Sequence, residues 1–75
     1  MSNKDYLIKV LASYFSLLHT AATSNEVAQD KYRAQVKQVD HDYVAILLML
    51  KTLTDKQLES GHTLESLKAQ FPIIQ

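Results

Sequence analysis

The chain has 75 residues with 8 basic and 8 acidic side chains, so it lacks the basic excess with which a nucleic-acid binder displaces counterions. It contains no cysteine, which excludes a disulfide framework, a thiolate zinc site and a thiol nucleophile. A single glycine and a single proline favour long helices over a sheet built on tight turns, and the length predicts one small domain.

The first expected element is a helix over residues 3–22. Ser2, with Asp5 three residues later, fits an N-cap. The seam that faces a neighbouring helix consists of Leu7, Leu11, Tyr14, Leu18 and Ala21. Apolar residues also flank this seam, Ile8 and Phe15 on one side and Tyr6, Val10 and Leu17 on the other. Together these positions span an arc of about 200°, so we expect this helix to need two neighbours.

A second, longer helix is expected over residues 24–53, with Thr23 and Glu26 as its capping box. Its seam alternates steps of four and three residues through Tyr32, Val36, Val39, Tyr43, Ile46, Leu50 and Leu53. The run "YVAILLML" at its end is apolar all round, because Val44 and Leu48 point away from the seam. The run stops at Lys51, far short of the roughly 20 residues of a membrane span.

Two short helices are expected after that, over residues 55–60 and 64–70. Thr54 with Gln57 fits a capping box for the first, and Thr63 fits the N-cap of the second, which Pro72 ends. Gly61 is expected to close the first in a left-handed conformation. The predicted fold is all-α: an antiparallel two-helix hairpin with a short helical C-terminal segment folded back on it. The sequence leaves open whether residues 54–75 pack on the core, contact a partner or stay mobile.

The side chains that could carry out catalysis or bind a metal are few and scattered, so we predict no enzyme, no cofactor and no metal site. His19, His41 and His62 are scattered along the chain, and the side chains of "DHD" at 40–42 fan out by about 100° each on a helix, so they cannot close on one ion. A chain with one glycine has no glycine-rich phosphate loop, and the serines of the first helix have no nearby base.

The apolar surplus predicts a protein partner, because the chain has more apolar surface than it can cover alone. The candidate partner-binding residues lie off the two seams: Tyr6, Ile8, Phe15, Leu17, Val44 and Leu48. Tyr6 is the strongest candidate among the tyrosines for an interface anchor, since aromatic residues are enriched in binding hot spots. The partner is a second copy or a different protein, and the sequence does not say which apolar face meets it.

The hairpin and its second helix, "KYRAQVKQVDHDYVAILLMLKTL", resemble the small E-type co-chaperones of type III secretion needle subunits over residues 7–53. The positions that carry this resemblance are Tyr32, Arg33, Ile46, Leu47 and Leu50. The resemblance implies a hairpin that docks on a larger helical-repeat chaperone. The pair would keep the needle subunit soluble and unpolymerised in the bacterial cytoplasm before export.

Two other classes of function stay open on the sequence alone. One is a homodimeric helical adaptor or regulatory co-factor, with seams paired across a two-fold axis. The other is an antitoxin or phage-type inhibitor that masks a site on an enzyme, with Arg33 in the polar first half of the second helix as part of its surface. We expect a cytoplasmic protein, although the sequence does not show whether the chain is exported.

Overall fold

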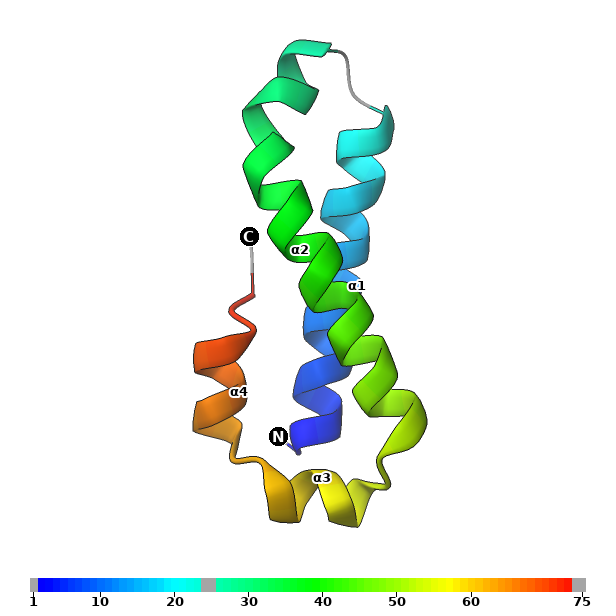
Figure 1. The fold of residues 1–75 in the computed structure, drawn as a ribbon, viewed down its shortest axis with the longest axis vertical. Coiled ribbons are helices and arrows are strands. Elements are labelled where there is room, and N and C mark those ends of the chain that lie inside the picture. Colours follow the sequence, from blue (N-terminus) through cyan, green and yellow to red (C-terminus); the bar gives the residue numbers. More distant parts are fainter. Residues whose placement is uncertain (1, 24–25, 74–75) are drawn as a thin grey trace.

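Four helices follow one another along the chain, and none of the described residues forms a strand. The computed structural model describes residues 2–23 and 26–73, except for the side chains of residues 26–29, 31 and 32. The helices are α1 (Asn3–Thr23), α2 (Glu26–Thr52), α3 (Asp55–Gly61) and α4 (Leu64–Gln70). In Figure 1, α1 and α2 run antiparallel as a long hairpin, α3 crosses its open end and α4 returns beside it. The all-α hairpin predicted from the sequence is therefore confirmed.

The seam between α1 and α2 forms the centre of the molecule, whose dimensions are 43 × 21 × 17 Å. Four seam residues are at most 1% exposed: Leu7, Tyr14, Val39 and Ile46. Five more are half-buried against this core: Leu11, Leu18, Tyr43, Leu50 and Leu53. The alternating steps of four and three residues thus identified the packed stripe correctly wherever side chains are described. The side chain of Tyr32, the first predicted seam residue of α2, lies outside the described part.

Hydroxyl side chains cap the N-terminal ends of three of the helices. The Ser2 hydroxyl accepts the amide of Asp5 at 3.1 Å. Thr54 and Thr63 each accept a backbone amide three residues later and form reciprocal capping boxes with Gln57 and Ser66. Each box satisfies two amides that a helix start would otherwise leave unpaired. These caps match the sequence predictions.

The predicted box of Thr23 with Glu26 falls partly on residues 24–25 and on the Glu26 side chain, which lie outside the described part. Thr23 itself belongs to α1, where its hydroxyl donates to the carbonyl of His19 at 3.0 Å and to that of Thr20 at 3.3 Å. This back-bonding pattern is common for threonine within a helix.

The prediction of a left-handed Gly61 is wrong. Gly61 is the last residue of α3, and no described residue has a positive φ. The chain turns instead through two extended residues, His62 with φ −139° and Thr63 with φ −98°. Because Thr63 must be extended to cap α4, the direction changes there and Gly61 can remain helical.

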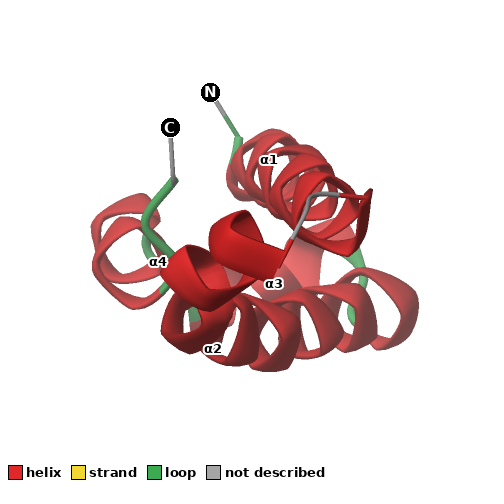
Figure 2. Ribbon diagram, turned by 90° about the horizontal axis from the view of Figure 1, so that it is seen from above, coloured by secondary structure: helices red, strands yellow, loops and turns green. Residues whose placement is uncertain are grey.

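The C-terminal segment, residues 54–73, covers one side of the hairpin. Figure 2 looks along the hairpin and shows α4 beside the two long helices. Three apolar residues of the segment are at most 2% exposed: Leu58, Leu67 and Phe71. Helices of seven residues are too short to be stable alone in water, so packing of these side chains is what holds α3 and α4 in place.

Polar contacts between distant parts of the sequence add to this packing. The Tyr6 hydroxyl donates to the carbonyl of Phe71 at 2.8 Å, and the Tyr14 hydroxyl donates to the carbonyl of Pro72 at 2.6 Å. The buried Asn3 side chain donates to the carbonyl of His62 at 2.8 Å. Each of these bonds ties α1 to the segment and satisfies a carbonyl that lies outside the regular helices.

Candidate functional site

The two apolar flanks of α1 have opposite environments. Tyr6 and Val10 are 4% and 0% exposed, whereas Ile8 and Phe15 are 47% and 59% exposed. Residues two positions apart on a helix point about 200° apart, so Ile8 lies on the side opposite Tyr6. Since Tyr6 bonds to the C-terminal segment, Ile8 and Phe15 face away from that segment.

The apolar end of α2 is divided in the same way. Asp42 is 8% exposed and lies close enough to Tyr14 for its charge to act on the Tyr14 phenol, so it points toward the side that the segment covers. Val44 is two residues further on, points to the opposite side and is 50% exposed. Leu48 follows one turn later and is 56% exposed.

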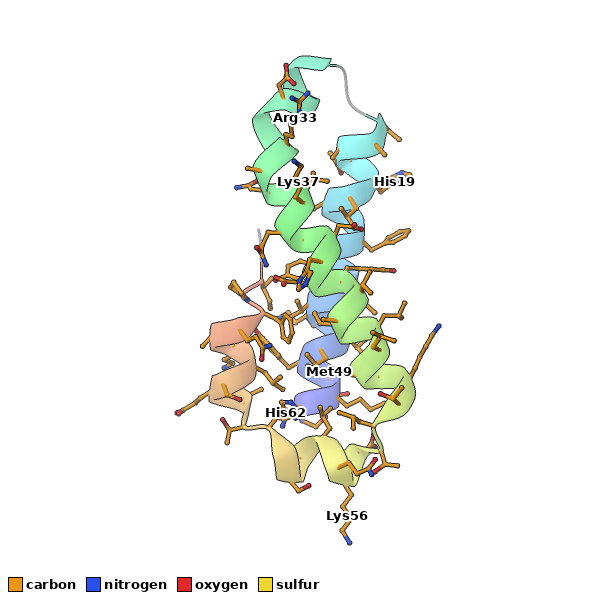
Figure 3. All side chains as sticks on the ribbon, viewed as in Figure 1. His19, Arg33, Lys37, Met49, Lys56 and His62 are labelled. Carbon is orange, nitrogen blue, oxygen red and sulfur yellow. The ribbon has the colours of Figure 1, made fainter. Side chains whose placement is uncertain are left out.

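These observations define two faces of the hairpin. The covered face consists of Tyr6, Val10, Tyr14 and Asp42, which lie on the side of the C-terminal segment. The bare face consists of Ile8, Phe15, Val44 and Leu48. In Figure 3, His19 lies on the edge of α1 that is turned away from α4. The Phe15 ring stacks on His19 with 6.3 Å between the ring centroids, which places Phe15 on the same edge.

Each long helix carries a second line of regularly spaced residues along the bare face. On α1 the line is Ile8, Ala12, Phe15, His19 and Ala22, and on α2 it is Lys37, His41, Val44, Leu48 and Lys51. Both lines alternate steps of four and three residues, and every member is exposed. Lines with this spacing run along every face of a helix, so what distinguishes the bare face is the exposure of the large apolar residues Ile8, Phe15, Val44 and Leu48.

Shallow hollows lie along α2 and between the two long helices. One, of about 420 Å³, is lined by Lys37, Asp40, His41, Val44, Ala45 and Leu48. Another, of about 380 Å³ near the closed end of the hairpin, is lined by Leu18, Ala21, Ala22, Arg33, Val36 and Lys37. Both are open to solvent and mainly apolar with lysine at the rim, which suits side chains of another protein better than a small ligand that must be enclosed.

Titratable groups do not gather on the bare face in a catalytic arrangement. Within the described ranges, no group of three histidine, aspartate or glutamate side chains is placed to hold a metal ion. His41 is 81% exposed and lies 3.7 Å from the carboxylate of Asp42. The shifted pKa values belong to the covered face: burial, with the negative charge of Asp42 second, raises the pKa of Tyr14 to about 12, and burial also raises the pKa of Tyr6.

The structure keeps four of the six predicted partner-binding residues on the surface: Ile8, Phe15, Val44 and Leu48. Tyr6 must be removed from that set, because its ring is buried and its hydroxyl is bonded to Phe71. Leu17 is half-buried against the core and contributes little exposed surface. The sequence could not distinguish the two flanks of α1, since both are apolar.

The sequence reasoning missed Ala12, His19, Lys37, His41 and Lys51, which complete the two lines of the bare face. It considered only large apolar residues outside the seams. Spacing could not have singled out these positions, because every helical residue belongs to a line of such steps once polar and small residues are counted.

No helix among the described residues is both long enough and apolar enough to cross a membrane. In comparisons with protein families, curated proteins and solved structures, none matches this chain.

Proposed function

We propose that this protein acts by binding rather than by catalysis, as a small helical module that docks on another protein through the bare face. The observation that supports this most directly is that the described part of the fold leaves Ile8, Phe15, Val44 and Leu48 exposed: the first two face away from the C-terminal segment, and the last two line one hollow on α2. Scattered exposed apolar residues are ordinary, whereas a group on one face is typical of an interaction site.

Phe15 is the expected anchor of this interface. Its ring is 59% exposed and stacks on the ring of His19, which is also exposed. Aromatic side chains contribute disproportionately to binding hot spots. Covering about 700 Å² of apolar surface on this side would contribute roughly 17 kcal/mol before the cost of association is subtracted.

The more specific proposal is an E-type co-chaperone of a type III secretion needle subunit, acting in the bacterial cytoplasm. The support is the resemblance over residues 7–53 together with a hairpin whose apolar face lacks cover from its own chain. The shortest members of that family do not account for the segment after Thr54. Here that segment covers the side with Tyr6 and Tyr14, so the opposite side is left for a partner.

Affinity purification from the native host tests the proposal, with wild type, Phe15→Asp and Ala69→Asp as baits. Ala69 is exposed on α4 and serves as the matched control outside the bare face. We expect wild type and Ala69→Asp to recover a helical-repeat chaperone and a small needle subunit. Phe15→Asp should lose both, because an aspartate in an apolar interface is left unpaired.

Circular dichroism of each bait shows whether the hairpin has survived the substitution, which is expected because residue 15 is exposed. Recovery of the same partners by Phe15→Asp would contradict docking through the bare face. Loss of binding by Arg33→Glu, with Phe15→Asp still binding, would favour an inhibitor that uses the polar first half of α2.

A further inference from the structure

We propose that a second copy of this chain occupies the bare face when no other protein does, related to the first by a two-fold axis parallel to the long helices. The proposal concerns the same face as the proposed function but does not depend on the identity of the partner. It rests on the width of the face, on which residues of its two lines lie at the same height along the hairpin, and on the placement of two charges.

The bare face is two helices wide, because both α1 and α2 contribute a line of exposed residues to it. A single partner helix would cover one line or the groove between them. A second hairpin matches the width, and two hairpins then form a four-helix arrangement of the kind that buries such stripes.

The heights of residues along the hairpin axis, on α1 compared with α2, decide how two copies fit together. Tyr14 lies level with Asp42, and Leu18 shares a hollow with Val36. A two-fold axis parallel to the helices leaves the height of every residue unchanged. It therefore places α1 of one copy antiparallel to α2 of the other, with the same residues level as within one hairpin. Ile8 then lies level with Leu48 of the other copy.

Phe15 lies, in the same arrangement, level with His41 of the other copy, with Lys37 and Val44 on either side. The apolar contacts of this arrangement therefore join Ile8 to Leu48, and Phe15 to Val44 and the aliphatic stem of Lys37. The lysine can lay its aliphatic stem along the ring while its ammonium group stays in water.

Charge is also compatible with self-association. The formal net charge is 0, so two copies do not repel each other at long range. Asp5 of one copy lies level with Lys51 of the other, and the two-fold axis repeats this pair. Both residues are exposed, and neither forms an ion pair within the described part of the chain.

The size of the face is adequate for a dimer. α1 has 21 residues and is therefore about 31 Å long, so a face two helices wide, at about 10 Å per helix, offers on the order of 600 Å² per copy, the lower end of a standard protein–protein interface. A domain of 75 residues has a core of limited size, so this additional burial is a large share of its apolar cover.

Disulfide trapping tests the arrangement directly, because the natural chain has no cysteine. Ala12 of one copy is expected level with Val44 of the other. Ala12→Cys and Val44→Cys, one of them carrying a tag that changes its size, are mixed in equal amounts and oxidised. Ala69→Cys, on the exposed surface of α4, replaces Ala12→Cys in the control mixture.

We expect the mixed disulfide of Ala12→Cys with Val44→Cys to dominate, and the control mixture to give only collisional background. Efficient trapping of Val44→Cys with itself would overturn the proposed axis, since that product requires α2 to lie against α2 of the other copy. Trapping equal to the control would overturn the proposal altogether.

Light-scattering mass across a hundredfold range of concentration gives the second measurement. We expect twice the 8.5 kDa of one chain for wild type, and dimer affinity about 100-fold weaker for Phe15→Asp because a buried carboxylate is left unpaired. A single-chain mass at every concentration would overturn the dimer. The proposed function would survive that result, because wild type could still recover its partner from the host.

Discussion

The covered and bare faces of the hairpin are built from similar residues and differ in what lies over them. Tyr6 and Tyr14 occupy one flank of α1, and Ile8 and Phe15 occupy the other. The tyrosine hydroxyls donate to carbonyls of the C-terminal segment, whereas isoleucine and phenylalanine have no donor to offer. Apolar character alone therefore does not decide which flank is covered. The hydroxyl groups satisfy the irregular backbone after α4 and so favour one side.

Substituting the two phenylalanines of the chain is expected to give the largest difference between the two faces in the free energy of unfolding. Phe71 is 2% exposed under the covered face, and Phe15 is 59% exposed on the bare face. Phe71→Ala is expected to lower the free energy of unfolding by about 3–5 kcal/mol because it leaves a cavity, while Phe15→Ala changes it by less than about 0.5 kcal/mol. Urea denaturation at low protein concentration, followed by circular dichroism, measures both. Equal effects would mean that the faces are not distinct.

Tyr14→Phe gives a smaller and more selective test, because it removes only the hydroxyl bonded to Pro72. We expect a loss of about 1 kcal/mol in the free energy of unfolding at neutral pH.

Ionisation of Tyr14 supplies a second signature. Its pKa is raised from 10.0 to about 12 in the folded chain, so the stability due to the neutral phenol is complete below pH 10 and is lost as the pH rises through 12. The gap in stability between wild type and Tyr14→Phe should therefore narrow over that range. Unfolding curves at successive pH values measure this gap, and a constant gap would show that the phenol is not buried.

Gly61→Ala has the smallest expected effect and tests the connection within the covering segment. Gly61 is helical, and a methyl group added there meets no atom within 4 Å. Alanine should therefore raise the free energy of unfolding by about 0.5–1 kcal/mol, because it restricts the unfolded chain more than glycine does. Thermal unfolding measures the change. A lower melting temperature would contradict a helical Gly61.

Much of the fold was readable from the sequence because it depends on local rules. The seam through Leu7 and Tyr14 follows from spacing alone, and Thr54 and Thr63 mark helix starts through contacts three residues away. Gly61 was misjudged because a glycine at a helix end has the same sequence context whether it is the last helical residue or a left-handed cap.

Only part of the candidate site could be predicted from the sequence, for a different physical reason. Periodicity gives the angle of a side chain around its own helix, but it does not say on which side a later segment returns. Tyr6 was therefore assigned to the surface with Ile8, although the segment buries Tyr6 and leaves Ile8 exposed. The decisive contact joins Tyr6 to a carbonyl 65 residues away, which no local pattern reveals.

The contacts of Asn3 have a consequence for the order of folding. Its backbone amide, in the first turn of α1, donates to the carboxylate of Glu59 at 2.9 Å, and its side chain donates to His62. The first turn of α1 is therefore fixed only once the C-terminal segment has packed against it. If the hairpin forms before that packing, both of its faces are open to neighbouring chains, and this intermediate is the state of the protein most prone to association.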